Sequence, residues 1–221
     1  MKNILCIPIL IGFLMLNACG GSKDKKEAAS ETPAAPTEKV PTMAINEADW
    51  EVTDLNPTSR IIPVSMKIPK GAKLEKNGNG GVDVTISDFY ILTVYQVAVS
   101  SIKEAMDDDK KLTVNNTTSY KDGKIIIDDP NGFVYTYQMK DEANGIKYKP
   151  QSHFYYYFTS GPNGAVFSVH DDKPMSGPSV PEQAYTLEIA KQVYEIVKGS
   201  ATVNGVKKAT KGAKGKKGKK H

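Results

Sequence analysis

The fold of this chain is decided by residues 153–170, HFYYYFTSGPNGAVFSVH. Residues 153–159 are nearly all aromatic, and residues 165–170 carry further aromatic and β-branched side chains; both compositions favour β-strands. Between them stands GPNG at 161–164, a run of turn-forming residues. The segment therefore predicts an antiparallel hairpin.

The consecutive aromatic side chains of this hairpin cannot all face one side of a sheet. Because side chains alternate along a strand, Phe154, Tyr156 and Phe158 should face away from Tyr155 and Tyr157. Either both faces of the sheet are covered, or one face presents tyrosines to solvent as a surface for a sugar or a peptide. A covered core is the interpretation that the sequence favours.

Turn signals at near-even spacing extend the hairpin into a meander. The turns are expected at 122–123 (Asp-Gly), 128–132 (DDPNG), and 144–145 (Asn-Gly). The strands that they separate are expected at 112–120, 125–127 and 133–140. Short strands bounded by such turns are typical of an antiparallel meander.

The flanking segments complete the expected fold. Residues 61–68 and 82–99 read as strands, the second with alternating apolar and polar side chains that mark one buried and one wet face. A short helix is expected at 101–108, and a C-terminal helix opens near 181 and stops at Gly199. The sum is an α+β fold, a two-layer sandwich of an antiparallel meander and a helix layer that includes the C-terminal helix.

This order of elements resembles that of the PsbP-like domains, named for an extrinsic photosystem II protein. The resemblance rests on element order over most of residues 50–199 and on the opening Ile68-Pro69-Lys70-Gly71. It implies a binding or assembly module, and it carries over no functional residue. A single domain is expected at residues 47–199.

The amino-terminus has the pattern of an export signal, with Lys2 followed by an apolar run at 4–16. The sequence Leu-Asn-Ala-Cys at 16–19 resembles the lipobox of bacterial lipoproteins. The resemblance implies cleavage after residue 18, diacylglycerol and palmitate-type acylation of Cys19, and a lipid anchor in the cell envelope. The outer membrane, on its periplasmic or its surface side, is the expected location. The alternative is an ordinary signal peptide that leaves Cys19 as a free thiol.

Two segments outside the expected domain have compositions that do not form a core. Residues 19–46 are rich in Gly, Ala, Pro, Lys and Glu and are expected to be a disordered tether. Residues 200–221 are expected to be a disordered Lys/Gly-rich tail. Its lysines are Lys207, Lys208, Lys211, Lys214, Lys216, Lys217, Lys219 and Lys220.

The lysine tail accounts for the basic net charge. The chain has 29 Lys and Arg against 25 Asp and Glu. Setting aside Lys2 and the eight tail lysines leaves 20 basic residues against the same 25 acidic ones, so the rest is mildly acidic. The tail is expected to attract polyanions through charge alone, because no aromatic residue among the lysines could stack on bases. Sequence-specific nucleic-acid binding is not expected, and a merely solubilising tail remains an alternative.

Few residues could carry enzyme chemistry. Cys6 lies in the expected signal peptide, and the histidines are His153, His170 and the tail residue His221. A hairpin register pairing Thr159 with Ala165 would place His153 opposite Asp171, with His170 nearby. Such a trio could serve a hydrolytic or metal-dependent envelope enzyme.

No metal or cofactor is expected from the sequence. The acidic clusters at 107–109, 128–129 and 171–172 lack the alternating ligands and the glycine of a calcium loop. No phosphate-binding glycine motif and no zinc-ligand spacing are present. The favoured function is therefore a lipid-anchored, non-enzymatic binding module for an envelope protein or glycan, with the enzyme as the alternative.

Overall fold

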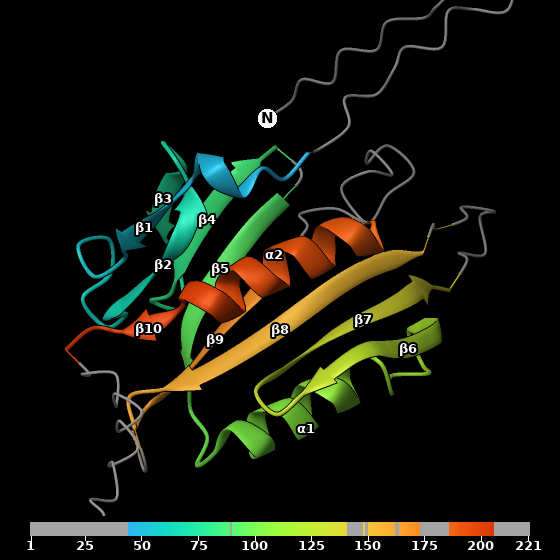
Figure 1. The fold of residues 1–221 in the computed structure, drawn as a ribbon. Coiled ribbons are helices and arrows are strands. Elements are labelled where there is room, and N and C mark those ends of the chain that lie inside the picture. The colour runs from blue at the N-terminus through green and yellow to red at the C-terminus, as the bar shows by residue number, and fades with distance from the viewer. Residues whose placement is uncertain are drawn as a thin grey trace, which may run out of the picture. The chain divides into compact units, whose positions relative to one another are not determined.

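The protein has an α+β fold in which antiparallel strands form two sheets (Figure 1). The computed structural model describes residues 44–88, 90–140, 148, 150–161, 164–172 and 186–205. The expected fold class is confirmed, including the antiparallel meander and the C-terminal helix. Among the described residues, no helix has both the length and the apolar character needed to span a membrane.

The larger sheet has seven antiparallel strands in the order β3-β4-β5-β9-β8-β7-β6. In that order the strands are Lys73–Lys76, Val82–Ser87, Tyr90–Val97, Val166–Asp172, Gln151–Thr159, Gly132–Met139 and Tyr120–Asp129. The meander β6 to β9 follows the chain, and the pairing of β5 with β9 joins it to the earlier strands. This pairing brings together residues that lie 69 to 81 positions apart in the sequence.

One face of the larger sheet is covered by α2 (Leu187–Ser200) and by a small second sheet. That sheet has the order β1-β2-β10, from Trp50–Asp54, Val64–Pro69 and Thr202–Val203, and a short 3-10 turn, η1 (Glu47–Asp49), precedes it. The apolar stripe of α2 packs on β8 and on β2, so the helix is buried along one side. Fully buried side chains from both sheets complete this core, among them Met66 of β2 and Phe154 of β8.

The other helix, α1 (Ile102–Leu112), covers the opposite face of the sheet at its β6–β8 end. Its N-cap is Ser101, whose hydroxyl accepts a hydrogen bond from the Glu104 backbone N–H at 3.2 Å. Ala105 and Met106 pack with Phe133 and other side chains of the meander. Figure 1 shows α1 beside β6 and β7, away from β3 and β4. Of the apolar side chains described around α1, the only one from β3, β4 or β5 is Val97, at the end of β5.

Two sequence predictions about the strands are wrong. Asp122-Gly123 does not end a hairpin; it lies inside β6, where the pairing with β7 slips between Lys121 and Lys124. Asp122 has a φ of 57°, so the turn-forming pair makes a bulge within the strand. Residues 113–119, expected as a strand, form turns that pack against this bulge, and a Cβ on Gly123 would lie 2.4 Å from the Val114 carbonyl oxygen.

Other element boundaries also differ from the predictions. The stretch 82–99 is two strands, β4 and β5, which pair with each other as a hairpin. Helix α1 extends to Leu112, beyond the expected 108. The structured part of the chain continues past Gly199, because β10 pairs with β2.

Candidate functional site

Several residues singled out from the sequence lie outside the described residues. These are Cys19 with its lipobox and the tail lysines from Lys207 onward. The lipid anchor and the polyanion-binding tail therefore stay predictions. The turn at 144–145 also lies outside the described residues.

The structure brings His153 and Asp171 together. The hairpin register pairs Thr159 with Val166, one residue away from the expected partner. His153 Nδ1 nevertheless lies 3.2 Å from Asp171 Oδ1, because the carboxylate reaches the backbone of β8 and accepts the Phe154 N–H at 3.0 Å. Its other oxygen accepts the Tyr90 hydroxyl at 3.1 Å.

The His153–Asp171 pair is buried inside the domain, with His153 7% and Asp171 4% exposed. His153 Nε2 lies 3.2 Å from Gln151 Oε1, which also accepts the Tyr137 hydroxyl. Burial and the nearby carboxylate raise the pKa of Tyr90 well above its usual range, so this tyrosine remains a hydrogen-bond donor. The network satisfies buried polar groups, which is a structural role.

His170 lies apart from that pair, at a different place on the sheet. It stands opposite Tyr155 in β8 and opposite Thr93 in β5. Its ring stacks on Tyr155, with the ring centres 5.1 Å apart, and meets the edge of Tyr95 at 5.4 Å. The trio expected from the sequence is therefore divided between a buried pair and a histidine on the open part of the sheet.

The aromatic strand contributes mostly to the core. Phe154 and Phe158 are buried in the core beneath α2, and Tyr157 is fully buried in the core beneath α1. The favoured interpretation, in which both faces are covered, is confirmed for these side chains. Tyr155 and Tyr156 of the same strand are only partly buried.

A polar hollow of about 480 Å³ occupies the part of the sheet that α1 does not cover. Across its centre runs a row of register partners, Asp83 in β4, Thr93 in β5 and His170 in β9. Tyr95 and the turn residues Asn77 and Asn79 complete its lining: Asn77, Asn79, Asp83, Thr93, Tyr95 and His170. Asp83 and Thr93 meet through the β4–β5 hairpin, and the β5–β9 pairing adds His170 to the row.

Hydrogen bonds hold the polar side chains of this hollow in place. Asp83 Oδ1 accepts the Asn77 amide at 2.9 Å and the Thr93 hydroxyl at 3.0 Å. The side-chain oxygen of Asn77 in turn accepts the backbone N–H groups of Asn79 and Gly81, which fixes the turn between β3 and β4. Within the described part of the chain, no group bonds the outer oxygen of Asp83 or the side-chain amide of Asn79.

Asp109 of α1 lies close to the same part of the sheet. Its carboxylate accepts the Tyr157 hydroxyl. Burial raises the pKa of Asp109, while the bond from Tyr157 and the nearby His170 act in the opposite direction. Burial and Asp109 also raise the pKa of Tyr95, whereas the nearby Ser168 side chain acts in the opposite direction. Both tyrosines therefore present hydroxyl groups, not phenolates, near the hollow.

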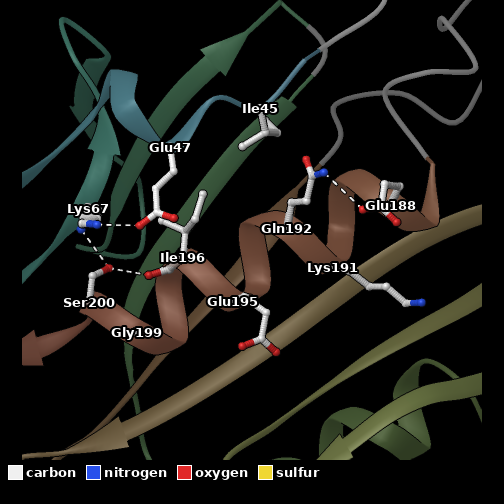
Figure 2. Close-up of a pocket in the computed structure, with 10 residues that line it drawn as sticks. All are labelled: Ile45, Glu47, Lys67, Glu188, Lys191, Gln192, Glu195, Ile196, Gly199 and Ser200. Atoms are coloured by element: carbon white, nitrogen blue, oxygen red, sulfur yellow. Dashed lines mark hydrogen bonds and ion pairs between the residues drawn. The ribbon is translucent and has the colours of Figure 1, made fainter.

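A second hollow, of about 440 Å³, lies along α2 (Figure 2). Ile196 contributes to its apolar part, and its rim carries both carboxylates and amines. Lys67 pairs with Glu47 at 2.6 Å, and Gln192 donates to Glu188 at 3.1 Å. These polar groups already bond to one another, so the groove does not indicate one class of ligand.

The sequence alone does not point to the polar hollow. The alternation in β4 marks Asp83 as belonging to a wet face, and Gly78-Asn79-Gly80-Gly81 is a pattern typical of a turn. Neither signal could connect these residues with Thr93 and His170. That connection depends on strand pairing.

Comparisons with known proteins give no relative for this chain: no family model, curated protein or solved structure matches it. The resemblances to lipoproteins and to PsbP-like domains therefore stay predictions. Among the described residues, no group of three or more His, Cys, Asp or Glu side chains is arranged to hold a metal ion.

Proposed function

We propose that this protein is a lipid-anchored lipoprotein of the cell envelope that acts as a non-enzymatic binding module. The observation that carries the proposal is the polar hollow on the open part of the larger sheet. Its side chains are oriented by hydrogen bonds among themselves, and they still offer unused polar groups. Concave sites with a few placed polar groups are typical of ligand binding.

The alternative, an envelope enzyme using His153, His170 and Asp171, has less support. His153 and Asp171 form a buried network with Tyr90 and Gln151. His170 points to the hollow instead. A general base must reach the proton that it removes, and burial of the pair argues against contact with a substrate.

The two ends of the chain have separate roles in this proposal. Acylated Cys19 holds the protein on the outer membrane, since two or more acyl chains give durable anchoring. The lysine tail adds salt-sensitive attraction to envelope polyanions. The folded domain supplies specificity for an envelope protein or glycan.

The anchoring part of the proposal is tested by cell fractionation. The full-length chain should appear in the membrane fraction and incorporate labelled fatty acid, and Cys19→Ser should abolish both. Ser22→Ala, three residues away, is the matched control and should leave both unchanged. Labelling that persists in Cys19→Ser would refute the assignment.

The binding part is tested by retention of the full-length Cys19→Ser chain, which lacks the lipid anchor, on isolated envelope fragments at low and high salt. Retention at high salt should fall in Tyr95→Ala, which removes a lining side chain of the hollow. A chain truncated after Gly205 should lose only the salt-sensitive fraction. If Tyr95→Ala retains full binding at high salt, the hollow is not the binding surface.

A further inference from the structure

We infer that the polar hollow on β4, β5 and β9 binds a neutral saccharide. The inference rests on the proposed function, because it names the ligand class of the same site. At about 480 Å³ the hollow falls within the roughly 300–1,000 Å³ of small-molecule sites. It is large enough for one or two sugar rings, and too small for a folded partner.

The polar groups of the hollow suit hydroxyl ligands. A sugar hydroxyl both donates and accepts a hydrogen bond. The outer oxygen of Asp83 can only accept, whereas the amide of Asn79 offers two donors and an acceptor. A neighbouring pair of sugar hydroxyls can therefore donate a hydrogen bond to the Asp83 carboxylate and accept one from the Asn79 amide. Bonds to the charged carboxylate are the stronger ones.

The carboxylate is oriented before any ligand arrives. Asn77 and Thr93 both donate to Oδ1 of Asp83, so the side chain is held with its other oxygen uncommitted. Asn77 is itself held by the backbone of Gly81 and Asn79. Such support lowers the ordering cost of binding.

Two aromatic rings give the hollow an apolar surface on which a sugar ring can pack. Tyr95 and His170 both line it, and their ring planes are nearly perpendicular, at 83°. The C–H face of a sugar ring packs on such aromatic surfaces, while its rim of hydroxyls needs polar partners. No leucine, isoleucine or valine is among the lining residues, so an apolar peptide side chain would find no pocket there.

The charge of the hollow selects against acidic ligands. The lining contains Asp83 and no lysine or arginine. A phosphate, sulfate or uronic acid would lie near this carboxylate with no lysine or arginine to pair with, which disfavours it. The lysine tail is therefore suited to polyanions, and the hollow to neutral or N-acetylated sugars.

The test uses the full-length chain in detergent, screened against an array of neutral, amino and acidic oligosaccharides, with calorimetry on the sugars that bind. Asp83→Asn keeps the shape of the side chain and should weaken binding of a neutral sugar about tenfold or more, as expected for a lost bond to a charged group. Tyr95→Ala should also weaken it. The matched control is Glu75→Gln, which removes a carboxylate from the register partner of Asp83 on β3 but not from the hollow.

Three results would overturn the inference: no binding to any neutral sugar, binding confined to acidic sugars or simple amines, or equal weakening by Asp83→Asn and Glu75→Gln. The proposed function is judged separately, by retention on envelope fragments. If retention depends on Tyr95 and no sugar binds, the hollow has another ligand class. If retention is independent of Tyr95, the proposed function fails as well.

Discussion

The carboxylate of Asp171 should be among the most important polar groups for stability. It accepts hydrogen bonds from the Tyr90 hydroxyl and the Phe154 N–H and lies 3.2 Å from His153 Nδ1. Tyr90 and Phe154 are fully buried and His153 nearly so. Asp171→Ala would therefore leave three buried groups without this acceptor.

The expected cost follows from these partners. Each buried polar group left without an acceptor costs about 1–3 kcal/mol, and three such groups contact this carboxylate. Water entering the space left by the carboxylate would recover part of the loss, so we expect about 3–5 kcal/mol for Asp171→Ala. That is a large share of the roughly 5–15 kcal/mol that stabilises a typical domain.

Urea unfolding of the full-length chain, followed by circular dichroism, measures the effect. With a slope of about 2–3 kcal/mol per molar, the midpoint should fall by about 1–2 M. Tyr90→Phe alone should cost about 1 kcal/mol, and it should cost much less when Asp171 is already alanine, because the two share one interaction. A loss below about 1 kcal/mol for Asp171→Ala, or full additivity with Tyr90→Phe, would refute the account of the network.

Three further predictions concern other parts of the chain. Because burial raises the folded-state pKa of Asp109, the folded protein binds this proton more tightly than the unfolded chain, and stability should fall as pH rises through and above the ordinary carboxyl range. Asp109→Asn keeps an acceptor for Tyr157 and should remove that part of the pH dependence. If the urea midpoints of the two proteins change by the same amount between pH 4 and pH 7, this explanation is wrong. A Cβ on Gly132 would lie 2.5 Å from the Tyr155 carbonyl oxygen, so Gly132→Ala should cost about 1–3 kcal/mol in thermal or urea unfolding. The matched change Gly78→Ala has open space around its Cβ and should cost clearly less. In the Cys19→Ser chain, which lacks the lipid anchor, truncation after Gly205 should abolish binding to anionic lipid vesicles at low salt without changing the unfolding midpoint. Unchanged vesicle binding would show that the tail is not the cationic element.

The local sequence pattern was sufficient to predict those helices and turns whose determining residues lie close together in the chain. The stripe of α2 recurs at helical spacing, and the helix forms with Ile189, Val193 and Val197 buried. The turn at 128–132 connects β6 to β7 as expected, because Pro and Asn there favour a turn with or without the rest of the protein. The fold class followed from the same local evidence.

Local pattern failed where one signal serves two structures. Asp-Gly supplies a positive φ equally well to a hairpin turn and to a bulge. The choice at Asp122-Gly123 depends on β7, which pairs on both sides of the bulge, and on the turn carrying Val114. The one-residue difference in register between β8 and β9 likewise came from pairing along the whole strands, which the sequence of the connecting loop does not specify.

The candidate site depended on tertiary structure altogether. Composition and motif identified the lipobox and the lysine tail, because both are continuous in sequence and act without a folded partner. Asp83, Thr93 and His170 carry no motif; they meet because β5 pairs with β4 on one side and with β9 on the other. A contact between residues so far apart is selected by burial of the whole core beneath α2, and no short window of sequence contains that information.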